Sequence, residues 1–381
     1  MSLFLISFFL IYGGIHLYAY LKLRTAAATG PLANLLIILF MVFMVLAPVL
    51  VRVAERQGFD PAAHVLSWIG YVWMGFLLLF FSASILFDLY RFLLWAGGWV
   101  ARKDLSYLAP AYRFSFYVPL ALSIVLCLYG YFEALNIRVE RVVLKSPKIP
   151  ESLGKVTVAQ ISDVHLGLIV RQGRLERILG KVRESNPDVL VSTGDLVDGQ
   201  INKLESLADM FGRIQPRFGK YAVTGNHEYH AGLEQALAFT EKAGFTILRG
   251  EGRTVAGLIN IAGVDDPAGL GFRRVRSAQE REILSSLPQD KFTLFLKHRP
   301  RVDGDALGFF DLQASGHTHN GQIFPFTLLI RMVYPENSGL TPLGHSFLYV
   351  SRGTGTWGPP IRFLAPPEVT IFEIRHDGAP R

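Results

Sequence analysis

The sequence predicts a chain in two parts: a membrane region of four transmembrane helices at residues 1–134, and an α/β domain at residues 153–381. Two observations support this division. Apolar runs long enough to cross a bilayer are confined to the first part, whereas the second alternates short strand-like and helix-like runs with Gly, Pro and charged residues. In the second part we expect two mixed β-sheets, sandwiched together and flanked by helices. Residues 135–152 are interpreted as a linker.

Four stretches in the first part have the length and apolarity of membrane spans, which need about 20 residues each. Apart from His16, their interiors contain no ionisable side chain, whereas pumps and transporters need charged groups along their pathway. The region is therefore interpreted as an anchor, and a transport function is disfavoured. The expected spans are residues 3–21, 32–51, 65–87 and 114–132.

The segment that follows the third span, residues 88–103, combines aromatic side chains with positive charge. Such residues are enriched where a membrane meets water. Two interpretations remain open for this segment. It is either a helix that lies at the level of the lipid head groups or the continuation of the third span.

The charges that flank the spans bear on the side of the membrane that the α/β domain occupies. Four spans place both termini on one side. Six basic residues lie in the loops of the opposite side and two in the loop of the terminal side, so the positive-inside rule favours an extracytoplasmic domain. Four basic residues that follow the last span favour the reverse. The six residues of the opposite side are Lys22, Arg24, Arg91, Arg102, Lys103 and Arg113, and the two of the terminal side are Arg52 and Arg56. The four that follow the last span are Arg138, Arg141, Lys145 and Lys148.

The net charge of +7 does not indicate nucleic-acid binding, because the basic residues are scattered or flank apolar runs and form no cluster interleaved with aromatics. Membrane lipid is the expected partner of this charge. The only cysteine, Cys127, lies within an apolar run. Any metal in the α/β domain must therefore be held by nitrogen and oxygen ligands.

The α/β domain is expected to begin with alternating strands and helices and to continue with further strands. The stretch at 324–346 contains three prolines and is expected to be a long loop that faces the substrate. The expected strands are 155–162, 188–193, 220–224, 258–264, 292–297, 312–315, 347–351 and 369–374, and the expected helices are 171–185, 203–214 and 233–243.

Five short motifs each follow a strand-like run directly. Alone, each motif is weak evidence for a metal site; a single histidine, for example, is more often a core residue than a ligand. Because the carboxyl ends of strands open into one crevice in α/β sheets, we expect the five to meet in space. Together they offer ligands for two divalent cations, a centre that makes hydroxide at neutral pH and predicts hydrolysis of phosphate esters. The motifs are Asp163-Val-His165, Gly194-Asp195-Leu-Val-Asp198, Gly225-Asn226-His227-Glu228, His298 and Gly316-His317-Thr-His319.

In their order and spacing, these motifs resemble the signature of the calcineurin-like metallophosphoesterases over about residues 155–380. Residues 315–323 and 351–368 resemble its bacterial membrane-associated branch, typified by YkuE and YaeI, which is also similar to the UDP-diacylglucosamine pyrophosphatases. The resemblance implies two divalent metal ions that share Asp195, and mixed oxygen and imidazole ligands admit Mn, Fe, Zn, Co or Ni. The implied ligands are Asp163, His165, Asp195 and His319 for one metal, and Asp195, Asn226, His298 and His317 for the other.

His227 is the expected general acid, with Asp198 accepting a hydrogen bond from its ring to orient it. An alternative makes Asp198 a helix N-cap and His227 an additional metal ligand. Gly199 follows Asp198 where the Ser/Thr protein phosphatases have an arginine that binds the phosphoryl group, so protein phosphatase activity is disfavoured. Arg352 and Arg299 are the candidate substrate-binding residues, and for both a salt bridge or an exposed surface charge is the structural alternative.

Asn320 is a second departure from the pattern of the branch, where glycine is usual at this position. Asparagine tolerates left-handed backbone angles better than most residues. The effect of this departure on the shape of the backbone therefore depends on the local conformation.

The expected function is a membrane-anchored dinuclear-metal phosphohydrolase that cleaves phosphomonoester or phosphodiester bonds through a metal-bridging hydroxide. The anchor favours a lipid-linked substrate. One alternative is a UDP-diacylglucosamine-type glycolipid pyrophosphatase, which would release UMP. The other is a catalytically idle membrane sensor or scaffold, which the complete set of implied ligands disfavours.

Overall fold

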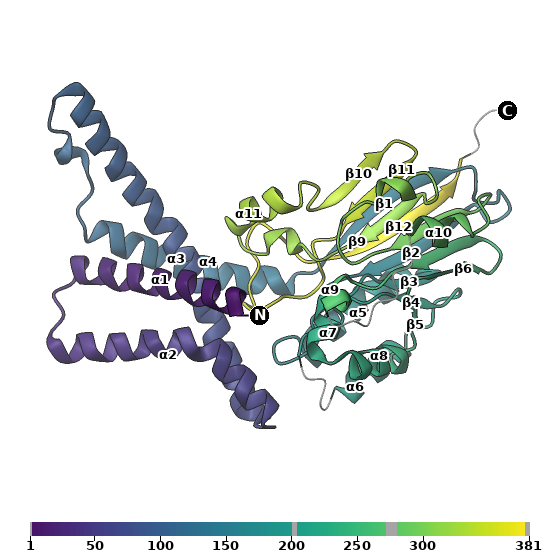
Figure 1. Ribbon diagram of the computed structural model, residues 1–381, viewed down its shortest axis with the longest axis horizontal. Coiled ribbons are helices and arrows are strands. Elements are labelled where there is room, and N and C mark those ends of the chain that lie inside the picture. Colours follow the sequence, from purple (N-terminus) through teal and green to yellow (C-terminus); the bar gives the residue numbers. More distant parts are fainter. Residues whose placement is uncertain (1, 200–203, 272–279, 378–381) are drawn as a thin grey trace. The chain divides into compact units, whose positions relative to one another are not determined.

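A computed structural model of the chain describes residues 2–199, 204–271 and 280–377 (Figure 1). The contacts between residues divide the chain into two compact units. The membrane unit comprises Met1–Phe132 together with Gly358–Ile361, and the sheet unit comprises Glu133–Trp357 and Arg362–Arg381.

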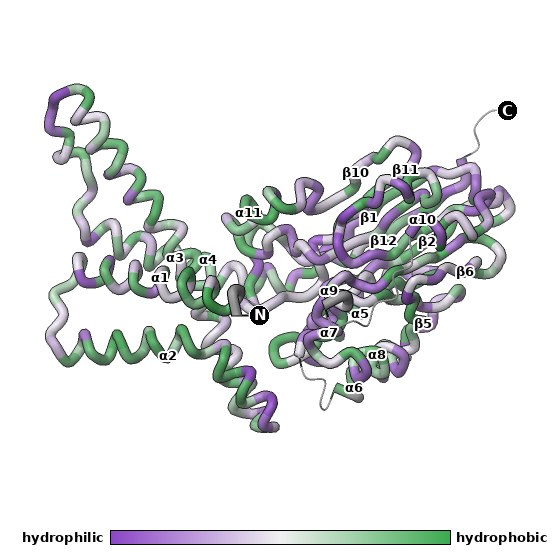
Figure 2. The backbone as a smooth tube through the Cα atoms, viewed as in Figure 1, coloured by the Kyte–Doolittle hydropathy of each residue, from purple (hydrophilic) through white to green (hydrophobic). Residues whose placement is uncertain are grey.

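In the described part of the membrane unit and the adjoining residues, four helices are long and apolar enough to cross a membrane, as predicted. Figure 2 shows that hydrophobic residues predominate along them. The third helix is 42 residues long and includes almost all of the aromatic and basic segment at 88–103, so this segment continues the third helix. The four helices are α1 (Ser2–Ala26), α2 (Pro31–Arg56), α3 (Asp60–Ala101) and α4 (Phe114–Leu135), and a 3₁₀ turn, η1 (Ser106–Leu108), lies between the last two.

In its described residues the sheet unit contains two six-stranded mixed sheets, which confirms the predicted class of fold. The first sheet has the strand order β1-β12-β2-β3-β4-β5, and the second has the order β10-β11-β9-β8-β7-β6. The strands are β1 (Arg138–Ser146), β2 (Lys155–Ile161), β3 (Val189–Ser192), β4 (Lys220–Ala222), β5 (Thr246–Ile247), β6 (Glu251–Val255), β7 (Ile259–Gly263), β8 (Phe292–Leu296), β9 (Leu312–Ser315), β10 (Gly339–Leu343), β11 (Ser346–Val350) and β12 (Glu368–His376).

Apolar side chains that alternate along the strands divide the core into layers. In β2, Ala159 and Ile161 pack with the helices on the outer face of the first sheet, whereas Val156 and Val158 pack against the second sheet. This division follows from the period of two in a strand. Helices α5 (Gln172–Ser185), α6 (Glu205–Gly212) and α8 (Leu233–Lys242) contribute to the first layer, and α10 (Glu280–Ser285) packs on the outer face of the second sheet. The predicted helix 203–214 corresponds to α6, and its first residue, Lys203, lies outside the described residues.

The prediction of a linker at 135–152 is wrong for the residues of β1. This strand pairs in parallel with β12 along its full length. It lies at the edge of the first sheet, where Arg138, Arg141 and Lys145 are exposed. Charged residues are common on edge strands, so β1 lacks the buried apolar run by which the central strands were predicted.

The prediction of a continuous loop at 324–346 is also wrong, because the stretch forms helix α11 (Phe326–Val333) and strand β10. The prolines bound these elements. Pro325 caps the beginning of α11, and Pro335 follows its end, positions where a missing N–H costs little. Pro342 lies in β10, an edge strand, where proline is tolerated.

Candidate metal centre

The predicted site residues follow the carboxyl ends of strands in both sheets. In the first sheet, Asp163, Asp195 and Asn226 follow the parallel neighbours β2, β3 and β4. In the second, His298 and the Gly-His-Thr-His motif follow the parallel neighbours β8 and β9. The two edges are joined directly, because the backbone N–H of His317 lies 3.0 Å from both carboxylate oxygens of Asp163 and donates to them. Residues from five separate segments thus converge.

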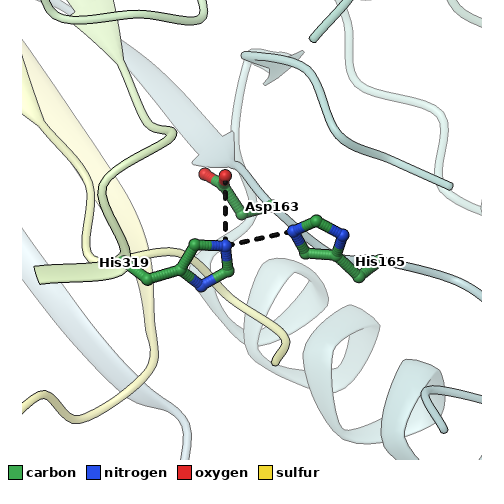
Figure 3. Close-up of side chains that lie close together, drawn as sticks. All are labelled: Asp163, His165 and His319. Atoms are coloured by element: carbon green, nitrogen blue, oxygen red, sulfur yellow. Dashed lines mark hydrogen bonds and ion pairs between the residues drawn. The ribbon is translucent and has the colours of Figure 1, made fainter. Parts of the chain in front are cut away.

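The first group of metal-ligating side chains consists of Asp163, His165 and His319, which point toward one another in Figure 3. Nε2 of His319 lies 3.0 Å from Nε2 of His165 and 3.4 Å from Oδ1 of Asp163. All three side chains are buried. At most one proton fits between two imidazole nitrogens at this distance, and a cation would be coordinated by the lone pairs of both.

The second group consists of Asp195, His298 and His317. Nε2 of His298 lies 3.3 Å from Oδ2 of Asp195, 3.1 Å from Nδ1 of His317 and 3.3 Å from Oδ1 of Asn226. Nδ1 of His298 lies 2.8 Å from the backbone oxygen of Thr193. A ring nitrogen that donates to a carbonyl fixes the tautomer, so the neutral ring would offer the lone pair of Nε2 to a cation in the group.

Asp195 connects the second group to the first. Its Oδ2 atom is 3.8 Å from Nε2 of His165 in the first group, and its Oδ1 atom accepts a hydrogen bond of 2.8 Å from the backbone N–H of His227. A further set of close side chains combines Asp195 with His165 and His227. A buried carboxylate in contact with both groups has the position that a ligand shared by two neighbouring cations requires.

The electrostatics of the site also fit divalent cations. Burial by itself lowers the pKa of His298, but the carboxylates of Asp195 and Asp163 outweigh it and raise this pKa well above its usual value. In contrast, burial and the charge of His298 lower the pKa of His317 to about 3. The site therefore attracts positive charge while His317 stays neutral, which is the form in which imidazole binds a metal.

The backbone of the site adopts an uncommon conformation. Five of the grouped residues have left-handed backbone angles, with φ between +49° and +71°. Non-glycine residues rarely do so, and strained conformations concentrate at functional sites. Two glycines allow the close approach of the chain segments, because a Cβ atom at Gly225 would overlap with Asp195 and one at Gly316 would overlap with Asp163. The five residues are Asp163, His165, Asp195, His317 and His319.

Asn320, which replaces the glycine usual in the resembled branch, also has a left-handed conformation, with φ 49° and ψ 35°. Its side-chain oxygen accepts a hydrogen bond of 2.8 Å from Nδ2 of Asn337. Asparagine is thus accommodated in the backbone shape that glycine would adopt, and the departure from the pattern leaves the turn intact.

Glu228 supports the site from behind. Its buried carboxylate accepts hydrogen bonds from four backbone N–H groups, at 2.6 Å from Gly225, 2.8 Å from Leu196, 3.1 Å from Asp195 and 3.4 Å from Val197. These bonds tie the segment after β3 to the segment after β4. The carboxylate therefore fixes the loop that carries Asp195.

His227 and Asp198 lie together beside the two groups. Nδ1 of His227 is 2.8 Å from Oδ1 of Asp198, and Nδ1 of His165 is 3.5 Å from the same oxygen. Burial lowers the pKa of His227, but the charges of Asp195 and Asp198 and the hydrogen bond to Asp198 raise it to about 9. Asp198 is not the N-cap of a helix in the part of the chain that the structure describes. The grouping of His227 with His165 and Asp195 leaves open whether it acts as an acid or as a ligand.

Arg299 and Arg352, the candidate substrate-binding residues, both form ion pairs. Nε and an Nη atom of Arg299 lie 2.8 and 3.0 Å from the carboxylate oxygens of Asp266. Arg352 lies 2.6 Å from Glu368 and also contacts Glu140. The salt bridge weighed as an alternative for each arginine is present, and a role in substrate binding stays a prediction.

Sequence reasoning assigned no role to Arg362, which is fully buried behind His319. Its guanidinium donates to the backbone oxygens of Arg352 and Gly355 at 2.6 Å and lies 3.2 Å from Nδ1 of His319. The arginine therefore holds the chain after β11 against the first group. Its partners are backbone carbonyls, which leave no trace in the sequence. The only available signal was a charged residue between Ile361 and Phe363.

Comparisons with known proteins agree with this geometry. The family model described as "Calcineurin-like phosphoesterase" matches residues 156–321, which include all five motifs. An uncharacterized metallophosphoesterase of Aquifex aeolicus is 39% identical over 262 residues, which cover 68% of this chain and 99% of that protein. The uncharacterized metallophosphoesterase YkuE of Bacillus subtilis is 31% identical over 65% of this chain and 90% of its own.

A relative from Danio rerio combines both kinds of region in its name, "Transmembrane protein with metallophosphoesterase domain". It is 34% identical over 269 residues, which cover 67% of this chain and 62% of the relative. The four apolar helices of the present chain agree with a membrane protein of this kind.

Proposed function

Because the chain belongs to the calcineurin-like metallophosphoesterase family, and is thus a metal-dependent phosphoesterase, we propose that it hydrolyses phosphomonoesters or phosphodiesters linked to lipid at the membrane that anchors it. One observation carries this proposal. Carboxylates and imidazoles from four segments converge in two groups joined through Asp195, and Asn226, from a fifth segment, lies beside the second group. The four apolar helices support the lipid part of the proposal, since a soluble substrate gains little from an anchor.

We propose that the two groups hold two divalent cations, drawn from Mn, Fe, Zn, Co and Ni. When bound, such a pair activates water and neutralises charge on the phosphoryl oxygens. Asp195 would be the shared ligand, and Asn226 would add its amide oxygen to the second group. The proposed ligands are Asp163, His165, Asp195 and His319 for one cation, and Asp195, Asn226, His298 and His317 for the other.

His227 is the proposed general acid. With a pKa near 9 it is protonated at neutral pH, and its Nδ1–H group forms an ion pair with the carboxylate of Asp198. Nε2 is then the atom that gives its proton to the departing oxygen of the substrate, while the carboxylate of Asp198 stabilises the ring in both states and fixes its orientation. Arg299, which follows His298 directly, and Arg352 remain the proposed contacts for phosphoryl oxygens, each sharing its charge with its carboxylate partner.

The test is a panel of substrates and metals applied to the full chain in detergent micelles. p-Nitrophenyl phosphate, bis(p-nitrophenyl) phosphate and a UDP-linked diacylglucosamine are each assayed with Mn²⁺, Fe²⁺, Zn²⁺, Co²⁺ or Ni²⁺. We expect turnover of at least one ester with bound metal, and a large decrease of this turnover in Asp195→Asn and in His227→Ala. Parental turnover by both folded variants would exclude the proposed site.

Two other functions remain as outcomes of this panel. Release of UMP from the UDP-linked lipid would identify a glycolipid pyrophosphatase, which uses the same centre. A folded, metal-free chain with no turnover would identify a sensor or scaffold. A fusion reporter at the C-terminus tests the proposed extracytoplasmic side of the sheet unit, and we expect no gain in activity from nucleic acid.

A further inference from the structure

Exposed apolar side chains gather on helix α11 and the residues just before it. Among the described residues from Glu133 onward, eleven large apolar side chains are exposed, and six of them lie within residues 324–333. Met332 is the most exposed, at 81%. Figure 2 shows α11 as a hydrophobic segment of the sheet unit. We call these six residues the α11 patch: Phe324, Phe326, Leu328, Leu329, Met332 and Val333.

The α11 patch is attached directly to the candidate metal centre. The helix follows the 3₁₀ turn η3 (His319–Gly321), and Oγ1 of Thr327 donates to the backbone oxygen of Asn320 at 2.8 Å. The ring of Tyr334, at the end of α11, lies 5.5 Å from the ring of His317. The apolar surface therefore begins just after the turn that carries the proposed ligand His319.

Trp357, outside the α11 patch, connects this surface to the proposed general acid, His227. Trp357 is 52% exposed, and its ring lies 6.1 Å from the ring of His227. Its backbone exchanges hydrogen bonds of 2.9 Å with the side chain of Gln322, just before the patch. Tryptophan is typical of surfaces where protein, lipid and water meet.

The path of the chain relates this edge of the sheet unit to the membrane anchor. Only two residues separate Leu135, the last residue of the candidate span α4, from Arg138, the first of β1. Arg138 pairs with Glu368 at the beginning of β12, which runs antiparallel to β2. The beginning of β1 therefore lies at the edge where β2 ends and the metal ligands follow.

The α11 patch is hydrogen-bonded to the same edge. The backbone N–H of Phe324 donates to the oxygen of Phe363 at 3.0 Å, and the N–H of Arg138 donates to the oxygen of Pro367 at 2.9 Å. The segment 363–367 thus lies between the patch and the entry of the chain from the last span. Leu364, in this segment, is 61% exposed and extends the apolar surface.

We propose that the α11 patch inserts into the lipid interface of the membrane to which the four spans anchor the chain, and that the metal centre takes phosphate esters of lipids from that surface. A bilayer is the occupant because the chain comes from a candidate span at this edge and because an apolar helix face with an exposed basic residue, Arg331, suits an interface. This inference deepens the proposed function and rests on it for the substrate, though not for the contact with lipid.

The contact is tested in the full chain by fluorescent labels at single cysteines, with Cys127→Ser as the background. One variant carries Met332→Cys and a second carries Leu328→Cys, so that failure of one to fold leaves the other. The matched control is Leu307→Cys, an exposed leucine in the loop before β9, at the opposite edge of the sheet. The chain is reconstituted in vesicles of phosphatidylcholine and phosphatidylglycerol.

We expect phosphatidylcholine with a nitroxide on its acyl chain to quench the labels at 328 and 332 at least about twofold, and aqueous iodide to quench the label at 307 instead. If iodide quenches all three labels alike, the patch faces water and the proposal is wrong. If neither agent quenches the labels at 328 and 332, another protein surface or a second copy covers the patch, which also contradicts it.

The substrate is tested separately by the ratio of kcat/KM for long-chain phosphatidic acid to that for p-nitrophenyl phosphate. We expect Met332→Glu to lower this ratio about tenfold, because a charge weakens the insertion of the helix, and Leu307→Glu to leave it unchanged. An unchanged ratio in Met332→Glu would refute supply from the bilayer. Because quenching is measured without turnover, failure of the proposed function and failure of the lipid contact give different results.

Discussion

Replacing Glu228 by glutamine should destabilise the sheet unit, although the two side chains have nearly the same shape. The carboxylate accepts two N–H groups at each oxygen: those of Leu196 and Val197 at Oε1, and those of Gly225 and Asp195 at Oε2. The amide of glutamine has one acceptor oxygen, and its NH₂ group would direct its own N–H donors toward the backbone N–H donors. In either orientation two buried N–H groups lose their acceptor.

The size of the effect follows from this count. A buried donor without an acceptor costs about 1–3 kcal/mol, so two cost about 2–6 kcal/mol. The charge of Asp195 repels the carboxylate of Glu228, and together with burial it raises the pKa of that group. Removing the charge relieves this repulsion, so we expect the lower part of the range, about 2–4 kcal/mol of unfolding free energy.

The assay is pulse proteolysis of the full chain in detergent micelles across a series of urea concentrations. With a slope of about 2–3 kcal/mol per M, the expected loss lowers the midpoint for the sheet unit by about 1 M. The control is Glu241→Gln, because Glu241 is exposed on α8. If Glu228→Gln shifts the midpoint no more than this control does, the carboxylate is not the link between the two segments and the reasoning is refuted.

Three further predictions concern the metal centre. Asp195→Asn should lower the amount of bound metal, measured by elemental analysis, because Asp195 contacts both groups. It should also lower kcat/KM by at least about 1000-fold. His227 is protonated below its raised pKa, so kcat/KM should fall as the pH rises toward about 9, and bound cations would shift this decrease to lower pH. The pH profile of His227→Ala should lack this decrease. Metal at 100 times its Kd should add about 2.7 kcal/mol to the unfolding free energy of the parent but not of Asp195→Asn, by the same proteolysis assay.

The central strands and the site could be predicted from the sequence for one physical reason. Strands such as β2 and β8 are buried on both faces, so they appear as short apolar runs, and a polar motif directly after such a run must lie at a carboxyl end of the sheet. The convergence of Asp163 and Asp195 follows from that topology. The division of ligands between two sheets does not, because the sequence does not show which strands pair.

The missed elements depend on features that a local interpretation of the sequence does not show. Strand β1 is half exposed and depends on pairing with β12, more than 220 residues later. Helix α11 presents its apolar face outward, so it lacks the buried stripe that marks an ordinary surface helix. Arg362 binds backbone carbonyls of a turn that its own burial helps to shape. For β1 and Arg362, the stabilising contacts are set by the fold and not by local composition.

The strain in the site explains why its support is so extensive. Five left-handed residues at about 1–2 kcal/mol each oppose folding by about 5–10 kcal/mol, which is comparable to the whole stability of many domains. That cost must be offset by contacts that exist only in this arrangement, such as the four N–H groups on Glu228 and the N–H of His317 on Asp163. The apolar layer between the sheets holds both strand edges at fixed spacing, so these hydrogen bonds can form. The geometry of the metal groups is therefore a property of the packed sheets, and substitutions that loosen either edge should disturb ligands contributed by both.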